Sequence, residues 1–217
     1  MHNKIIKSFI ILFITSFTIS LSACASKHKV IKERSETFIA DIDSFELDEI
    51  PLYASLALAN PSVKTFVLDF YPRTNNVTIE GRIAPDAINI CFDYAERKKL
   101  YEAAKQYIQA YEEGTIKEEK PTKKNALCKG NVPLMWGVLG LGHSLDVNYT
   151  ANIEYLEPDK PYFRLKFDAT DDYSDNSSSP AINIYISPSQ WQTLFELCNQ
   201  EDLEARCDEI LEEADAF

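Results

Sequence analysis

The chain has 217 residues, and its formal net charge at pH 7 is −12 because 34 acidic residues outnumber 22 basic ones. This acid excess argues against general nucleic-acid binding, since contacts to phosphates supply most non-specific affinity. Apolar residues make up 45% of the sequence, which excludes a disordered chain and suffices for one domain or two small ones.

The N-terminus has the pattern of a secretory signal. Residues 1–7 carry two lysines and no acid, and residues 8–20 are apolar or hydroxylic. The apolar run is shorter than the roughly 20 residues that a membrane-spanning helix needs. We therefore expect export.

The segment Leu21-Ser22-Ala23-Cys24 follows this run and resembles the lipobox of bacterial lipoproteins. In that family the peptide is cut just before the cysteine, and the cysteine carries lipid. The resemblance implies that residues 1–23 are a cleaved signal peptide and that Cys24 is the lipidation site. An ordinary signal peptide and an uncleaved anchor remain as alternatives.

Residues 24–40 are predicted to form a lipid-anchored tether, which would hold the protein on a membrane of the cell envelope. Ala25 and Ser26 follow the cysteine, where an Asp often marks retention in the inner membrane of Gram-negative bacteria. The resemblance therefore favours an outer-membrane address in such a host. Loss of the lysines in the signal would take the net charge from −12 to −14.

Residues 41–115 are predicted to form a first unit of strands followed by a helix. Phe66, Leu68 and Phe70 alternate with other residues, as expected for a strand with one face on a core. Asp93 and Glu96 form a capping-box pattern at the start of a helix. The apolar stripe of this helix comprises Leu100, Ala103, Ala104, Tyr107, Ile108 and Tyr111.

Residues 116–130, rich in Lys and Glu, are predicted to be a linker to a second unit at 131–217. Alternating strands again precede a helix, which Ser187 and Gln190 would cap. A last helix is expected at about 201–216, and the acids on one of its faces suit a solvated surface or a docking site for a basic partner.

The two units appear to be copies. Residues 87–90 and 181–184 both have the sequence Ala-Ile-Asn-Ile, at an offset of 94. We therefore predict an α+β fold of two similar antiparallel sheet-plus-helix units with an additional C-terminal helix. This order is similar in architecture to the ββββα repeat of PUR-type proteins, which bind nucleic acid.

Four cysteines remain after Cys24, namely Cys91, Cys128, Cys198 and Cys207. They allow three connectivities, which the sequence does not resolve. Cys198 and Cys207 form the most plausible local disulfide, because each ends or occupies one of two successive helices. No pair has the CxxC spacing of a redox or zinc site.

No catalytic, metal or cofactor motif stands out. His143 lacks a nucleophile elbow, and a turn histidine is the simpler interpretation. The expected role is therefore non-catalytic binding or scaffolding, with an envelope protein or ligand as partner and no nucleic acid. An envelope hydrolase that uses carboxylates is the alternative, and a PUR-like nucleic-acid binder is a weaker one.

Overall fold

The computed structural model describes residues 33–172 and 177–215. The predicted signal peptide and Cys24 lie outside this range. Of the predicted tether, residues 33–40 are described, and Phe38, Ile39 and Ala40 at its end are buried. The folded body therefore includes these three residues.

Within the described residues, eight antiparallel strands form one closed barrel in the order β1-β10-β7-β6-β5-β4-β3-β2. Their bounds are β1 Phe45–Leu56, β2 Ser62–Tyr71, β3 Asn76–Ile83, β4 Asp86–Phe92, β5 Cys128–Gly137, β6 His143–Glu157, β7 Lys160–Phe167 and β10 Ile182–Ile186. Two short strands, β8 Asp171–Asp172 and β9 Ser177–Ser178, pair separately.

The predicted α+β fold of two sheet-plus-helix units is wrong. β4 pairs with β5 through Ile90↔Leu134, and β1 pairs with β10 through Ala54↔Ile184. These two ladders join strands from both halves of the chain into one barrel, so the resemblance to PUR-type repeats does not hold. A separate four-stranded sheet in each half would have left two unpaired edge strands per sheet. Closure into a single barrel pairs all of these edges.

Alternation along the strands produces the barrel interior. Phe66, Leu68 and Phe70 of β2 are fully buried, whereas Val67 and Asp69 between them are partly exposed. The same alternation recurs on β7, where Phe163, Leu165 and Phe167 are buried and the residues between them are partly exposed. Both strands therefore contribute large apolar side chains to the core.

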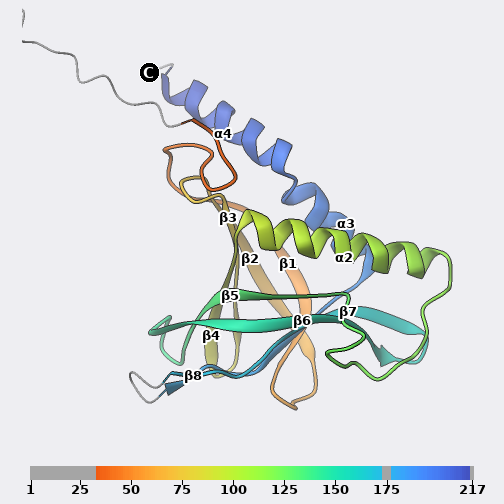
Figure 1. Cartoon of the computed structure of the whole chain (residues 1–217). Coiled ribbons are helices and arrows are strands. Elements are labelled where there is room, and N and C mark those ends of the chain that lie inside the picture. Colours follow the sequence, from red (N-terminus) through yellow and green to blue (C-terminus); the bar gives the residue numbers. More distant parts are fainter. Residues whose placement is uncertain (1–32, 173–176, 216–217) are drawn as a thin grey trace, which may run out of the picture. The chain divides into compact units, whose positions relative to one another are not determined.

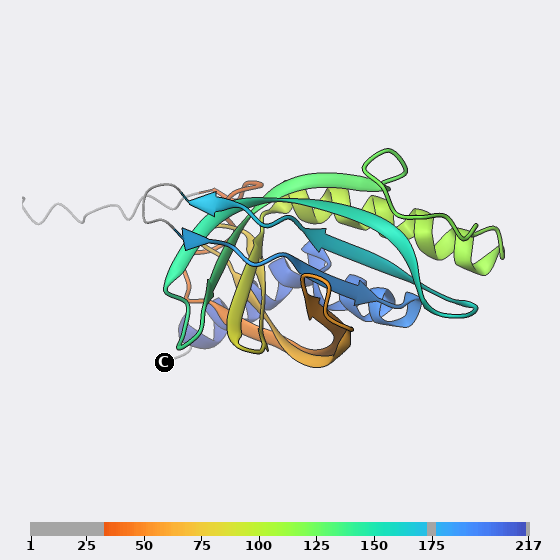
Figure 2. The ribbon, with the colours of Figure 1, turned by 90° about the horizontal axis from the view of Figure 1, so that it is seen from below.

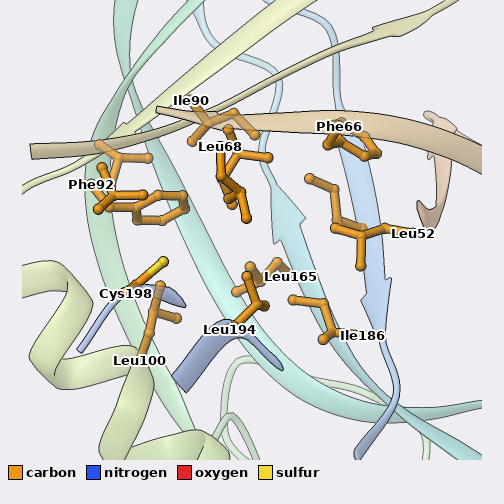
Figure 3. Close-up of a cluster of buried hydrophobic side chains, with 14 of the residues drawn as sticks. Leu52, Phe66, Leu68, Ile90, Phe92, Leu100, Leu165, Ile186, Leu194 and Cys198 are labelled. Atoms are coloured by element: carbon orange, nitrogen blue, oxygen red, sulfur yellow. The ribbon is translucent and has the colours of Figure 1, made fainter. Parts of the chain in front are cut away.

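The described residues form three helices: α2 Tyr94–Glu112 between β4 and β5, and α3 Pro188–Leu197 and α4 Gln200–Asp215 after β10. α2 and α3 lie on one side of the strands, at the top of Figure 1, and the view from below shows the strands in front of these helices (Figure 2). Leu100 from α2 and Leu194 from α3 point toward Leu68 and Leu165 of the barrel (Figure 3). The helices therefore complete the core.

The helix starts follow from local capping. Asp93 accepts a hydrogen bond from the backbone N–H of Glu96 at 2.7 Å, and Ser187 with Gln190 forms a complete capping box on α3. The carboxylate of Glu96 instead accepts a hydrogen bond from Tyr149, at 2.6 Å. None of the described helices is long and apolar enough to cross a membrane.

Candidate ligand-binding site

A cavity of about 380 Å³ lies between α2 and the junction of α3 with α4. We call it the α2 pocket. Its lining combines cationic, aromatic and amide side chains: Tyr94, Arg97, Lys98, Tyr101, Glu102, Lys105, Phe195, Cys198, Asn199 and Gln200.

Helical spacing gathers the α2 residues on one wall. Tyr94, Lys98, Tyr101 and Lys105 follow one another at intervals of three or four, so their side chains share a face of α2. The adjacent face of the helix packs on the barrel and carries buried Leu100. Core packing therefore orients the wall of the pocket.

Arg97 lies where the two faces meet, and only 5% of its surface is exposed. Its Nη2 donates to the backbone oxygen of Asn75 at 2.9 Å and to Oδ1 of the same residue at 2.6 Å. Nη2 also lies 3.2 Å from Oε1 of Gln200, and Nη1 lies 3.4 Å from the backbone oxygen of Cys198. These contacts connect α2 to the turn between β2 and β3 and to the end of α3.

The acceptors around Arg97 are all neutral oxygens. No carboxylate of the described residues forms an ion pair with the guanidinium, and its buried Nε has no hydrogen-bond partner there. The rings of Phe70 and Tyr94 lie 5.9 and 5.7 Å from the guanidinium carbon. Burial lowers the pKa of Arg97, while Tyr101 and Asp93 act in the opposite direction.

Two lysines extend the positive charge toward solvent. Lys98 lies 6.0 Å from the Tyr94 ring, and Lys105 pairs with Glu102 at 2.9 Å. Three cations and one acid line the pocket, so its formal charge is +2 in a chain of −12. The α2 pocket is thus a local exception to the acidic surface.

Aromatic side chains build the apolar wall. The rings of Tyr101 and Phe195 meet edge to face with their centroids 5.1 Å apart. The hydroxyl of Tyr101 donates to the backbone oxygen of Cys198 at 2.9 Å. Burial raises the pKa of Tyr101, so this hydroxyl stays protonated and remains a donor.

Two other cavities differ from the α2 pocket. One lies inside the core, is lined by residues that include Leu68 and Trp191, and measures about 40 Å³, close to the space one water molecule needs. The other, about 440 Å³, lies beside Tyr111 and Lys160, and none of its lining residues is a buried charge. Arg97 also lines the core cavity, which is too small for an organic ligand, and the cavity beside Tyr111 has no buried cation. The α2 pocket combines a buried cation with room for a small molecule.

The structure describes two of the three cysteines that were predicted as site residues. Cys24 lies outside the described residues. Cys198 and Cys207 are both free and buried, so the structure contains no bridge between them, and their disulfide stays a prediction. Burial raises the pKa of each thiol to about 11, which makes both poor nucleophiles. Cys198 was not predicted as a pocket residue, yet it forms part of the α2 pocket wall.

The histidine and the carboxylates that could take part in catalysis lie outside the α2 pocket. His143 stacks on Trp136, with ring centroids 5.3 Å apart, at the start of β6. Asp69 on β2 lies near Glu80 on β3, and burial, with a smaller contribution from Glu80, raises the pKa of Asp69. None of the three lines the α2 pocket. Across the described part of the chain, no group of three or more His, Cys, Asp or Glu residues could hold a metal ion.

A family model described as an uncharacterised Treponema protein matches residues 17–205. The chain belongs to this family. A relative from Treponema pallidum (strain Nichols), described as an uncharacterized protein, is 28% identical over 159 residues, which are 73% of this chain and 57% of the relative. The chain thus spans a little over half the length of that relative. No solved structure matches the chain at a significant level.

In this member of the Treponema family, the α2 pocket was not predicted from the sequence. The apolar stripe of α2 identifies only the face that packs on the core. The neighbouring stripe from Tyr94 to Lys105 alternates aromatic and basic side chains at helical spacing, which is unusual in so acidic a chain. That stripe could have indicated a binding surface on α2. The facing surface at residues 195–200 lies far away in the sequence, so no local pattern links the two.

Proposed function

We propose that this protein is a lipid-anchored, non-catalytic binding protein of the bacterial cell envelope, and that it holds its ligand in the α2 pocket. The observation that carries the proposal is Arg97, a buried guanidinium at the wall of a cavity of about 380 Å³ that has no counter-ion among the residues the structure describes. Ligand sites commonly combine mostly apolar walls with a few oriented polar groups in a cavity of this size.

The anchor part of the proposal is supported by the segment that ends at Cys24. Each lipid methylene buried in a membrane contributes about 0.8 kcal/mol, so two or more acyl chains anchor a protein stably. A body this acidic would be repelled by anionic headgroups, so covalent lipid would supply its membrane affinity. The proposed address is the envelope, and the outer membrane in a Gram-negative host.

The non-catalytic part of the proposal is supported by the chemistry of the pocket lining. It contains one carboxylate, Glu102, which pairs with Lys105, and one thiol, Cys198, whose pKa is raised by burial to about 11. General acid–base catalysis needs a group that exchanges protons near the working pH. The pocket residues are better suited to holding a ligand than to transforming one.

A carboxylate hydrolase is the second candidate, and the proximity of Asp69 to Glu80 on the neighbouring strand is the observation that favours it. The raised pKa of Asp69 resembles the environment of a general acid. Asp69 and Glu80 occupy outward positions of the barrel and, like Val67, are partly exposed. Polymer hydrolysis that disappears in the Asp69→Asn and Glu80→Gln variants would favour this candidate over the binding role.

Metabolic labelling tests the anchor. The Cys24→Ser variant, expressed in a bacterial host, should accumulate as an uncleaved precursor that takes up no labelled palmitate. The unchanged protein should be labelled and processed, and the Cys128→Ser variant provides a control for the loss of a thiol. Labelling of the Cys24→Ser variant would show that the lipid is attached elsewhere.

Native mass spectrometry tests the binding role. The full chain, extracted from its envelope in mild detergent, should carry a bound molecule or a partner that dissociates when the protein is denatured. A preparation that carries neither and that turns over an envelope polymer would contradict the proposal.

A further inference from the structure

We infer that the ligand of the α2 pocket is a small soluble organic anion, with a phosphate or carboxylate on an apolar or aromatic body. This inference rests on the binding role proposed above and specifies the chemistry of the ligand. It starts from Arg97, which is buried to 95% and faces only neutral oxygens.

A buried cation is costly unless an anion compensates its charge. Backbone and amide oxygens satisfy some of the N–H groups of Arg97, but they leave its positive charge in place. Nε has no partner among the described residues. Nε is itself buried, and Nη1 and Nη2 already donate to protein oxygens, so the feature that the guanidinium offers to the pocket is its uncompensated charge. A carboxylate or phosphate in the neighbouring cavity would compensate that charge.

Lys98 supplies a second cation to the same cavity from the next position of α2. None of the ion pairs formed among the described residues involves Lys98. Lys99, its neighbour, pairs with Glu96 at 2.6 Å and does not line the pocket. The two adjacent lysines thus differ in whether a carboxylate already neutralises them.

The walls define the rest of the ligand. Tyr94, Tyr101 and Phe195 present aromatic surface, which favours an apolar or planar body next to the charged group. About 380 Å³ accommodates a small molecule and not a polymer. The net charge of −12 also disfavours a polyanion, which would meet repulsion beyond the pocket.

Calorimetric titration of the full chain in mild detergent tests the inference with three probes of similar shape. Phenyl phosphate and benzoate carry the anionic group, and benzyl alcohol carries none. We expect saturable binding of at least one anion and weaker or no binding of the alcohol. Equal binding of the alcohol would overturn the role assigned to charge.

Matched variants locate the site. Lys98→Gln should weaken binding of the anion about tenfold, as expected for loss of one charge-assisted contact, whereas Lys99→Gln should leave it within about twofold. Arg97→Gln should abolish binding. Because Arg97 also connects three elements, circular dichroism must show that the Arg97→Gln variant is folded. If that variant does not fold, the Lys98→Gln variant still tests the site.

A short-chain phosphatidic acid at the same concentration separates a lipid headgroup from a soluble ligand. If only this lipid binds, or if neither anion binds, the inference is overturned. Equal affinities of the Lys98→Gln and Lys99→Gln variants would also overturn it. A cargo found by native mass spectrometry that is neutral would leave the binding role standing and reject the anion.

Discussion

At the scale of single residues, Arg97 carries a positive charge at a buried position, where burial disfavours charge. Its hydrogen bonds connect Asn75, Gln200 and the end of α3, but its charge has no counter-ion among the described residues. A purely structural residue at this position would be served better by a neutral side chain. In the proposed complex, the anion in the α2 pocket would compensate this charge.

Burial of the Cys198 thiol makes the free energy of unfolding depend on pH in the alkaline range. The pKa of Cys198 is about 11 in the folded protein, above its ordinary value of 9.0. Because the unfolded chain loses this proton first, the stabilisation is complete below about pH 9 and is lost as pH rises toward 11. Between pH 8 and 10.5 the thiol should remove about 2 kcal/mol from the free energy of unfolding.

Urea unfolding under reducing conditions checks this expectation. The fall in the free energy of unfolding between these two pH values should be about 2 kcal/mol smaller in the Cys198→Ala variant than in the unchanged protein. Equal falls in the two proteins would show that the thiol is not protected by burial.

Residue patterns predicted the helix caps only in part. Asp93 and Ser187 cap α2 and α3 as expected, because capping depends on neighbours three positions away. Glu96 does not complete its capping box, since Tyr149 offers a competing donor from β6. That donor is 53 positions away in the sequence, so the local pattern did not reveal it.

At the scale of elements, Gly130 allows α2 to approach the barrel. A Cβ at this position of β5 would clash with Oε2 of Glu96 and with the ring of Tyr149. Gly130→Ala must therefore displace the hydrogen bond that joins α2 to β6. We expect the free energy of unfolding to fall by about 2 kcal/mol.

Gly142→Ala is the matched control, because a Cβ there meets no atom within 4 Å. Its free energy of unfolding should stay within about 0.5 kcal/mol of the unchanged protein in the same chemical denaturation experiment. A Gly130→Ala variant as stable as this control would mean that α2 and β5 are farther apart than described.

Alternation of Phe66, Leu68 and Phe70 identified the buried face of β2, and the structure agrees. It did not identify partner strands, because a period of two is the same whichever strand lies alongside. The pairing of β4 with β5 spans α2 and the predicted linker, so no local turn signals it. The fold class was therefore wrong although the strand at Phe66, Leu68 and Phe70 was predicted correctly.

At the scale of the whole molecule, barrel closure predicts one cooperative unit. The ladders Ile90↔Leu134 and Ala54↔Ile184 connect the halves of the chain. Amides of β4–β5 and β1–β10 should therefore exchange with the same free energy of opening as amides of β2–β3. The short β8–β9 pair should open much more easily.

Native-state hydrogen exchange with mass spectrometry measures these opening free energies. Two classes of amide, one for residues 45–112 and one for residues 128–197, would indicate that the halves unfold separately. That result would contradict a barrel shared by both halves.

The α2 pocket is the proposed ligand site, and a ¹H–¹⁵N NMR titration of the full chain in micelles with phenyl phosphate examines it residue by residue. We expect saturable shifts confined to amides of residues 94–105 and 195–200. Absent shifts, or shifts centred on Asp69 and Glu80 of the outer barrel face, would show that the ligand does not bind in this pocket.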